Sequence, residues 1–171
     1  VTLKYKKYDG NWSNEIKREL FGGAQVSAVL PYDPINKKIV LIQQFRPGTI
    51  SRNNNNYLDE IVAGIIDPGE NPEETAVREC FEETGCKAKN LRAIQGYFPA
   101  PGSSESFYHL FLGEVVAPKK EIIKGLDNEN EDILVKSCSF EEIKNKLENN
   151  EILNGLTLIA LQWFFLNIYK S

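Results

Sequence analysis

An acidic helix, predicted over residues 72–84, constrains this chain of 171 residues more than any other feature. Pro72 suits the first turn of a helix, and Gly85 suits the position just past its end. Within this segment Glu79, Glu82 and Glu83 stand at positions i, i+3 and i+4, so one helix face carries all three carboxylates. Carboxylates at these spacings repel one another by roughly a few tenths of a kcal/mol per pair. A compensating cation is therefore expected on this face.

The kind of cation follows from the ligands nearby. Seven acidic residues lie in the segment from Asp67 to Glu83, against a single arginine, Arg78. Oxygen ligands without histidine or cysteine favour hard cations, so the predicted cofactor is Mg²⁺, for which Mn²⁺ can substitute. A Glu-x-x-Glu-Glu helix taken alone is also compatible with a solvated acidic surface, and this alternative stays open until more of the chain is considered.

A longer motif includes these glutamates. Its fixed residues are Gly64, Glu70, Arg78, Glu79, Glu82, Glu83 and Gly85. Their spacing resembles the Nudix box, Gly-x5-Glu-x7-Arg-Glu-U-x-Glu-Glu-x-Gly-U, in which U is a bulky aliphatic residue. Cys80 and Cys86 occupy the U positions, where a small thiol serves as an apolar group. The resemblance implies hydrolysis of a nucleoside diphosphate linked to another moiety. Gly64 and Gly69 predict a tight loop that brings backbone close to phosphate.

The same resemblance implies metal-binding and catalytic roles for acidic residues in two segments. The implied metal ligands are the carbonyl oxygen of Ala63 and the carboxylates of Glu79, Glu82, Glu83 and Glu131. The implied catalytic residues are Glu79, Glu82, Glu83 and Glu129, with Glu129 as the base. Glu70 and Arg78 would hold the carboxylates in place. Two alternatives stay open for residues 127–132: Glu131 as the base, and a solvated acidic loop without a catalytic role.

Further stretches resemble the ADP-ribose pyrophosphatase branch of the Nudix family. They are residues 29–34, 40–46, 60–64, 125–133 and 158–163, and Pro101 lies sixteen residues beyond Gly85, as in that branch. The implied reaction converts ADP-ribose to AMP and ribose 5-phosphate. The implied substrate-binding residues are Arg18, Arg46, Glu60, Gly64, Pro101, Gly102 and Glu105.

The loop that follows Pro101 departs from the pattern of this branch. It is one residue shorter and lacks the arginine that the branch carries there. Hydrolysis of another nucleotide sugar, such as GDP-mannose or UDP-glucose, is therefore one alternative. A Nudix-fold nucleotide sensor without catalysis is a second alternative, although a sensor has no need for so repulsive a cluster of glutamates.

Aromatic side chains and the single histidine are weaker candidates. Trp12, Tyr97 and Phe98 have rings suited to stacking on adenine, yet aromatic residues at strand spacing are more often core residues. His109 has no clustered partner in the sequence, so a structural role is expected for it. Arg18 and Arg46 are equally compatible with exposed positions on strands.

The order of strand and helix patterns predicts an α+β Nudix fold, namely an α/β/α sandwich with a mixed sheet and a short N-terminal β-hairpin. Strands are expected at 3–8, 15–21, 25–30, 38–45, 57–63, 91–98, 107–116 and 133–138. Helices are expected at 72–84, at 139–147 and at 153–169, the last of them apolar nearly all round and therefore buried. Residues 1–23 form the hairpin region, and residues 24–171 form the Nudix domain.

Net charge and cysteine content limit which partners and which cellular compartment are expected. Twenty lysines and arginines against 24 aspartates and glutamates give a net charge of −4, which disfavours nucleic acid. No stretch resembles a membrane span or a leader, and three cysteines without a CxxC pair indicate a reducing cytoplasm. The chain contains no methionine, so further residues are expected before Val1. The resemblance implies a homodimer in which the hairpin contacts the partner, and a small nucleotide sugar as substrate.

Overall fold

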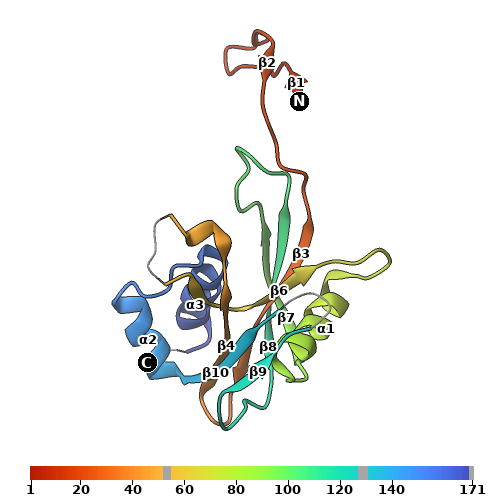
Figure 1. Ribbon diagram of the computed structural model, residues 1–171. Coiled ribbons are helices and arrows are strands. Elements are labelled where there is room, and N and C mark those ends of the chain that lie inside the picture. The colour runs from red at the N-terminus through yellow and green to blue at the C-terminus, as the bar shows by residue number, and fades with distance from the viewer. Residues whose placement is uncertain (52–54, 127–130, 170–171) are drawn as a thin grey trace.

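The central strands carry runs of consecutive apolar residues, so both faces of one sheet are buried. The computed structural model describes residues 1–51, 55–126 and 131–169. Its elements are β1 (Thr2–Leu3), β2 (Ile16–Lys17), β3 (Gln25–Asp33), β4 (Lys38–Phe45), η1 (Pro47–Thr49), β5 (Tyr57–Glu60), β6 (Val62–Ile65), α1 (Pro72–Thr84), β7 (Lys89–Tyr97), β8 (Phe107–Glu114), β9 (Ile122–Lys124), β10 (Ile133–Ser139), α2 (Phe140–Glu148) and α3 (Gly155–Asn167). Helix α1 covers one face of the sheet, while α2 and α3 cover the other (Figure 1). The predicted α/β/α sandwich is thus confirmed.

The main sheet is mixed, as the sequence predicted. In the described part of the chain it has eight strands, with the principal order β7-β8-β3-β4-β10-β9. Strands β3 and β8 run parallel, from the pair Gln25 and Phe107 to the pair Tyr32 and Glu114. Strand β4 pairs antiparallel with β10, and β7 pairs antiparallel with β8. The parallel pair β3 and β8 thus lies inside the sheet, with β7 at the edge next to β8.

Strands β3 and β4 diverge, and the space between them is filled by two further strands. They pair next to their hairpin, where Tyr32 lies opposite Ile39. Farther from the hairpin, β6 pairs with β3 and β5 pairs with β4. The buried residue Ile61 lies at the break between β5 and β6, and its N–H donates to Thr157 Oγ1 at 2.9 Å. The prediction of one strand over 57–63 is therefore wrong, because the chain changes its strand partner at Ile61.

Two apolar cores lie on opposite faces of the sheet. The core on the side of α2 and α3 includes Ala28, Leu30, Ile39, Leu41, Leu110 and Leu112. The core on the side of α1 includes Val29, Val40, Ile42 and Phe111, together with Ala76 and Cys80 of the helix. Successive residues of β3, β4 and β8 thus enter different cores, which is why these strands are apolar throughout.

Residues 1–23 form an arm that projects beyond the sheet (Figure 1). Strands β1 and β2 pair antiparallel within it, and Lys6 forms an isolated bridge with Trp12. The predicted hairpin is confirmed, but its strands have two residues each instead of the predicted six and seven. The arm has no neighbouring sheet or core to extend its pairing, since nearly all of its residues are exposed.

Other differences from the prediction have local causes. Strand β9 was not predicted, because three residues carry too little periodicity. Helix α3 is not buried all round: Leu161 and Phe164 are fully buried, whereas Leu166 is 76% exposed. Helix α1 has the predicted bounds. Within the described residues, no helix combines the length and the apolar character needed to cross a membrane.

Asp59 of β5 joins three other elements of the fold. Its carboxylate, 10% exposed, accepts hydrogen bonds at 3.0 Å from Gln43 of β4, Lys136 of β10 and Lys146 of α2. Burial acts to raise the pKa of Asp59, but the hydrogen bonds and charges of the two lysines outweigh it, and the pKa is lowered. The ionised carboxylate therefore stabilises the fold.

We expect Asp59→Asn to lower the free energy of unfolding at neutral pH by about 2 kcal/mol, because two lysines lose their carboxylate. The lowered pKa means that this stabilisation is present above the ordinary aspartate pKa of 3.8 and is lost as the pH falls through the folded value. The difference from wild type should therefore shrink at about pH 3.5, which urea denaturation at both pH values measures. Asp9→Asn, which removes an exposed pair with Lys7, is the control. An equal loss in both variants would contradict the prediction.

Candidate active site

Helix α1 is fixed at both ends by its own sequence. The Asn71 side chain accepts a hydrogen bond from the Glu74 N–H at 3.0 Å, and the Glu74 carboxylate accepts one from the Asn71 N–H at 3.1 Å. Gly85 ends the helix in the left-handed region, with φ of 72°. Ser27 of β3 donates its hydroxyl to the Pro72 carbonyl at 2.5 Å. The start of the helix is thereby held against the sheet.

Arg78 gathers three glutamates of the predicted motif. Its Nε and Nη2 donate to the two oxygens of Glu70 at 2.8 and 3.0 Å, and its Nη1 donates to Glu79 and Glu82 at 2.8 Å each. Hydrogen bonds from Arg78 and then from Thr75 lower the pKa of Glu70 to about 2. The bond to Glu70 in turn raises the pKa of Arg78. The guanidinium is therefore fixed, and it orients Glu79 and Glu82.

Glu83 is the buried carboxylate of this helix face, with 3% exposure. Its Oε2 accepts a hydrogen bond from the Ala63 N–H at 3.3 Å. Burial, followed by the charges of Glu79 and Glu131, raises the pKa of Glu83 to about 9. Burial also raises the pKa of Glu79, although Arg78 acts in the opposite direction. Burial and mutual repulsion thus disfavour charge on these carboxylates, which a bound cation would reverse.

These carboxylates line a cavity of about 280 Å³, called the acidic cavity below. Its lining residues are Ala63, Gly64, Ile65, Asp67, Arg78, Glu79, Glu82, Glu83, Leu126 and Glu131. Five carboxyl groups face one guanidinium, and oxygen donors of this kind fit a hard divalent cation such as Mg²⁺. Within the described ranges, no three acidic, histidine or cysteine side chains already converge as a metal cage. Glu79 and Glu82 each direct one carboxylate oxygen to Arg78, which explains why their carboxylates do not converge on one point.

Gly64 permits the close approach of α1 to the sheet. It lies in β6, paired with Ser27, and not in the tight loop that the sequence suggested. A β-carbon at this position would overlap the Glu79 carboxylate. The prediction that Gly64 lies in a tight loop is therefore wrong, whereas its closeness to phosphate stays a prediction. The glycine is required because the Glu79 side chain lies directly against the β6 backbone.

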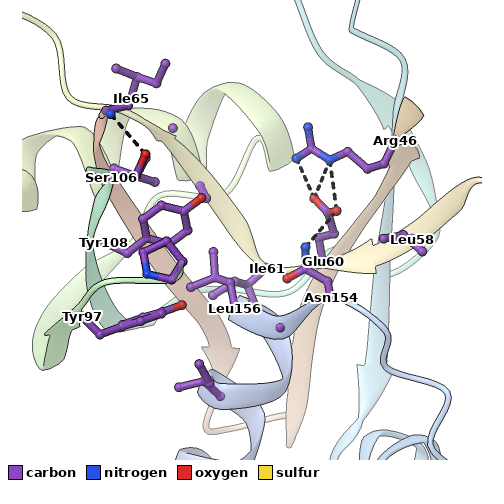
Figure 2. A pocket seen from close by; sticks show the side chains of 17 residues that line it. Arg46, Leu58, Glu60, Ile61, Ile65, Tyr97, Ser106, Tyr108, Asn154 and Leu156 are labelled. Atoms are coloured by element: carbon purple, nitrogen blue, oxygen red, sulfur yellow. Dashed lines mark hydrogen bonds and ion pairs between the residues drawn. The ribbon is translucent and has the colours of Figure 1, made fainter. Parts of the chain in front are cut away.

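A larger cavity of about 740 Å³, called the large cavity below, shares Ala63, Gly64 and Ile65 with the acidic cavity. Arg46 lies on one side of it, and its Nε and Nη2 donate to the Glu60 carboxylate at 2.7 to 3.1 Å (Figure 2). Among the described residues, Nη1 of Arg46 has no hydrogen-bond acceptor. One side of the guanidinium is thus held by Glu60, while the Arg46 side chain as a whole stays 46% exposed, which allows contact with an anionic ligand.

The opposite wall of the large cavity is aromatic and apolar (Figure 2). Tyr97 and Tyr108 lie with their ring centroids 5.7 Å apart. Burial, with a contribution from Tyr108, raises the pKa of Tyr97 to about 12, so its hydroxyl stays protonated. Ile61 and Leu156 add apolar surface between the tyrosines and Arg46. A cavity with one cationic side and one aromatic side suits a ligand that has a phosphate and a ring.

The structure brings most of the predicted site residues together at the two cavities. The acidic cavity gathers Ala63, Gly64, Glu79, Glu82, Glu83 and Glu131, and the large cavity adds Arg46 and Glu60. The predicted substrate-binding residues that line neither cavity are Arg18, Pro101, Gly102 and Glu105. The role of Glu129 stays a prediction, because this residue lies outside the described part of the chain.

The predicted residues outside the linings belong to two exposed segments. Arg18 lies on the arm and is exposed. Residues 101–105 belong to the loop between β7 and β8, which also supplies Ser106 to the large cavity. This loop contacts the base of the arm, where the Phe21 N–H donates to the Ser103 carbonyl at 2.9 Å. The loop supplies Pro99 and Ser106 to the large cavity, and Ala24, directly after the arm, lines it as well.

Sequence reasoning missed the residues that α3 and β8 supply. Asn154 caps α3, and it lines the large cavity together with Tyr108. Asparagine is a favoured N-cap residue, so the sequence contained a signal for a helix that begins after Asn154. The prediction placed the helix start at residue 153 and missed this signal. His109 contacts Gln25 at 3.3 Å and lines neither cavity, in line with the structural role expected for it. Trp12 is 68% exposed, so a core position is wrong for it.

A comparison with known domains gives the family. The NUDIX domain profile matches residues 23–156, which include α1, Arg46 and every residue that lines the acidic cavity. The chain belongs to the Nudix family. The predicted membership is confirmed, and α1 is the helix that carries the Nudix box.

Curated relatives match nearly the whole of this Nudix chain. It is 35% identical to an ADP-ribose pyrophosphatase of Escherichia coli strain K12, over 96% of this chain and 79% of the relative. It is 36% identical to an ADP-ribose pyrophosphatase of Haemophilus influenzae, over 98% and 78%. A GDP-mannose pyrophosphatase of Shigella flexneri is 30% identical, over 95% and 84%. These relatives are pyrophosphatases of two different nucleotide sugars.

Proposed function

We propose that this Nudix protein hydrolyses the pyrophosphate bond of ADP-ribose and releases AMP and ribose 5-phosphate in a Mg²⁺-dependent reaction. The observation that carries the proposal is the junction of the acidic cavity with the large cavity at Ala63, Gly64 and Ile65. A pyrophosphate placed at this junction has carboxylates for a cation on one side and Arg46 on the other. The relatives named ADP-ribose pyrophosphatase support this choice of substrate.

The residues of α1 would hold the cation. Glu79, Glu82 and Glu83 would bind Mg²⁺ together with the carbonyl oxygen of Ala63. Mg²⁺ bound there supplies positive charge to the phosphates and lowers the pKa of a coordinated water. Arg78 keeps Glu79 and Glu82 on the cavity side of the helix through its hydrogen bonds at 2.8 Å.

Two acidic residues are candidates for the proton acceptor. Attack on phosphorus requires a water that is held in line and gives up a proton. We propose Glu129 for this role. Glu131 is the second candidate, because it lines the acidic cavity and its charge raises the pKa of both Glu79 and Glu83.

Product analysis tests the proposed reaction. Full-length protein is incubated with ADP-ribose, with Mg²⁺ and with EDTA, and the products are separated by chromatography. We expect equal amounts of AMP and ribose 5-phosphate with Mg²⁺ and no products with EDTA. Binding of ADP-ribose without turnover in Mg²⁺ or Mn²⁺ would instead identify a nucleotide sensor.

The choice among nucleotide sugars needs a direct comparison, because one relative is a GDP-mannose pyrophosphatase. Rates with ADP-ribose, GDP-mannose and UDP-glucose give kcat/KM for each. We expect ADP-ribose to lead by roughly tenfold or more, since hydrogen bonds to a purine edge discriminate at about this level or above. A higher kcat/KM for GDP-mannose would replace ADP-ribose as the substrate while leaving the reaction type unchanged.

We also propose that the arm makes a homodimer. Tyr5, Tyr8, Trp12 and Phe21 of the arm are all more than half exposed, which is unusual for aromatic residues of a monomer. In a dimer the arm would cover these rings and could bring Arg18 to the large cavity of the partner. Sedimentation velocity should give twice the chain mass of 19.4 kDa. A monomer at assay concentration would contradict the proposal.

We propose a cytoplasmic location. Cys80, Cys86 and Cys138 are all free thiols, and the first two are buried. Free cysteines persist in a reducing compartment, which supports the cytoplasm. Fractionation of cells that produce the protein checks this location.

A further inference from the structure

Asn154, the N-cap of α3, uses both ends of its side-chain amide. Its Oδ1 accepts hydrogen bonds from the Thr157 N–H at 2.9 Å and from the Thr157 hydroxyl at 3.0 Å. Its Nδ2 donates to Glu60 Oε1 at 3.0 Å, across 94 residues of sequence (Figure 2). Capping a helix requires an acceptor alone, which serine or aspartate also provides. The donor end of the amide therefore has a separate role, and that role concerns Glu60.

Glu60 lies between Asn154 and Arg46. Its side chain is 4% exposed, whereas that of Arg46 is 46% exposed. The two Glu60 oxygens accept three hydrogen bonds from Arg46, at 2.7, 3.0 and 3.1 Å, and the fourth from Asn154. A buried carboxylate with all its acceptors used has one orientation, so the guanidinium that it binds is fixed as well. The chain of hydrogen bonds thus runs from the N-terminus of α3 through Glu60 to Arg46, on the cationic side of the large cavity (Figure 2).

A second bond ties the same helix end to the same place in the sheet. The hydroxyl of Thr157 accepts the buried N–H of Ile61 at 2.9 Å. Ile61 follows Glu60 and separates β5 from β6, and Ala63 of the acidic cavity comes two residues later. The first turn of α3 is therefore hydrogen-bonded to Glu60 and Ile61, the residues shortly before the segment that lines both cavities.

We propose that Asn154 is a positioning residue for the pyrophosphate: through Glu60 it fixes the guanidinium of Arg46 toward the large cavity. The inference rests on the proposed hydrolysis of a nucleotide sugar. Arg46 would contact the phosphate, and Asn154 acts through two other residues. Loss of the Asn154 donor leaves Glu60 Oε1 with only the bond from Arg46 Nε, so that the carboxylate and the guanidinium it binds are held less firmly while the helix cap remains. The effect falls on substrate binding more than on the chemical step.

The test separates the donor from the cap. Asn154→Ser keeps an oxygen acceptor for the Thr157 N–H and removes the donor to Glu60. We expect KM for ADP-ribose to rise roughly fivefold to tenfold, with kcat changed less than about twofold and Tm unchanged. Asn154→Asp keeps the size and the cap but sets a carboxylate against Glu60, and it should raise KM further. The control is Ser139→Asn, an exchange of two good caps at the start of α2, where the cap bonds join Ser139 to Glu142 and do not include Glu60.

A double-mutant cycle shows whether Asn154 acts through Arg46. In the Arg46→Lys background, Asn154→Ser should cause no further rise in KM, because the fixed guanidinium is already lost. An additive effect there, an unchanged KM in Asn154→Ser, or a loss of kcat and Tm together would overturn the proposal. Binding of ADP by calorimetry in EDTA gives a readout without turnover, in which Asn154→Ser should weaken Kd fivefold to tenfold. A wild type that binds ADP without hydrolysing ADP-ribose would refute the proposed function and leave this inference standing.

Discussion

Replacing Glu83 by glutamine is expected to lower kcat for ADP-ribose hydrolysis by roughly 10²-fold or more, while the protein stays folded. Glu83 is 3% exposed and lies between the Ala63 N–H and the acidic cavity. Glutamine keeps the size of the side chain and an acceptor oxygen for that N–H. It removes the negative charge that would hold a divalent cation next to the phosphates. Steady-state kinetics at saturating ADP-ribose and Mg²⁺ measure the loss.

The same substitution should lower activity without lowering the stability of the metal-free protein. Burial raises the pKa of Glu83 to about 9, so a neutral side chain avoids the cost of burying a charge. In EDTA, the free energy of unfolding of Glu83→Gln should therefore equal or exceed that of wild type. Added Mg²⁺ should raise the Tm of wild type more than that of the variant, because a ligand stabilises the state that binds it.

A matched variant shows whether the loss of activity depends on where on α1 the negative charge is removed. Glu73→Gln makes the same change at an exposed glutamate in the first turn of α1, and it should retain activity and the response to Mg²⁺. Full turnover by Glu83→Gln, or an equal loss in both variants, would contradict the placement of the cation at this helix face.

The fold was predictable wherever its signals are local. Helix α1 has the predicted bounds because Pro72 and Gly85 act within a turn of the residues they affect. The division of 57–63 at Ile61 was not predictable in this way, since every residue there is compatible with one strand. It arises because β5 pairs with β4 while β6 pairs with β3, and those partners diverge. Pairing of this kind depends on residues far away in the sequence.

The candidate site likewise has one part that local sequence signals predict and another part that depends on residues far apart in the sequence. The helix face of the acidic cavity was predictable because Arg78, Glu79 and Glu82 share one helix, where spacing alone sets proximity. The aromatic wall was not, because Tyr97 and Tyr108 meet through the register of β7 on β8. The bond from Asn154 to Glu60 spans 94 residues, and no local pattern links the two. The helix glutamates proposed to bind the cation are therefore close in sequence, whereas the residues that line the large cavity are scattered.

Glu129→Gln is expected to lower kcat by roughly 10²-fold to 10⁴-fold, as the loss of a general base does. Leu126 and Glu131, on either side of the segment 127–130, both line the acidic cavity. Glu129 itself lies outside the described residues, so its role as the base stays a proposal that this variant tests. A base removes a proton and does not bind the cation, so KM and the rise in Tm caused by Mg²⁺ should be unchanged in this variant.

Glu131→Gln is the companion variant that decides between the two carboxylates. Glu131 lines the acidic cavity and interacts electrostatically with Glu79 and Glu83, so its loss should weaken the response of Tm to Mg²⁺. Its kcat should recover in part at high Mg²⁺, because weaker binding is overcome by concentration, whereas the kcat of Glu129→Gln should not. A Glu129→Gln variant with full activity, together with a Glu131→Gln variant that no Mg²⁺ concentration restores, would assign the base to Glu131.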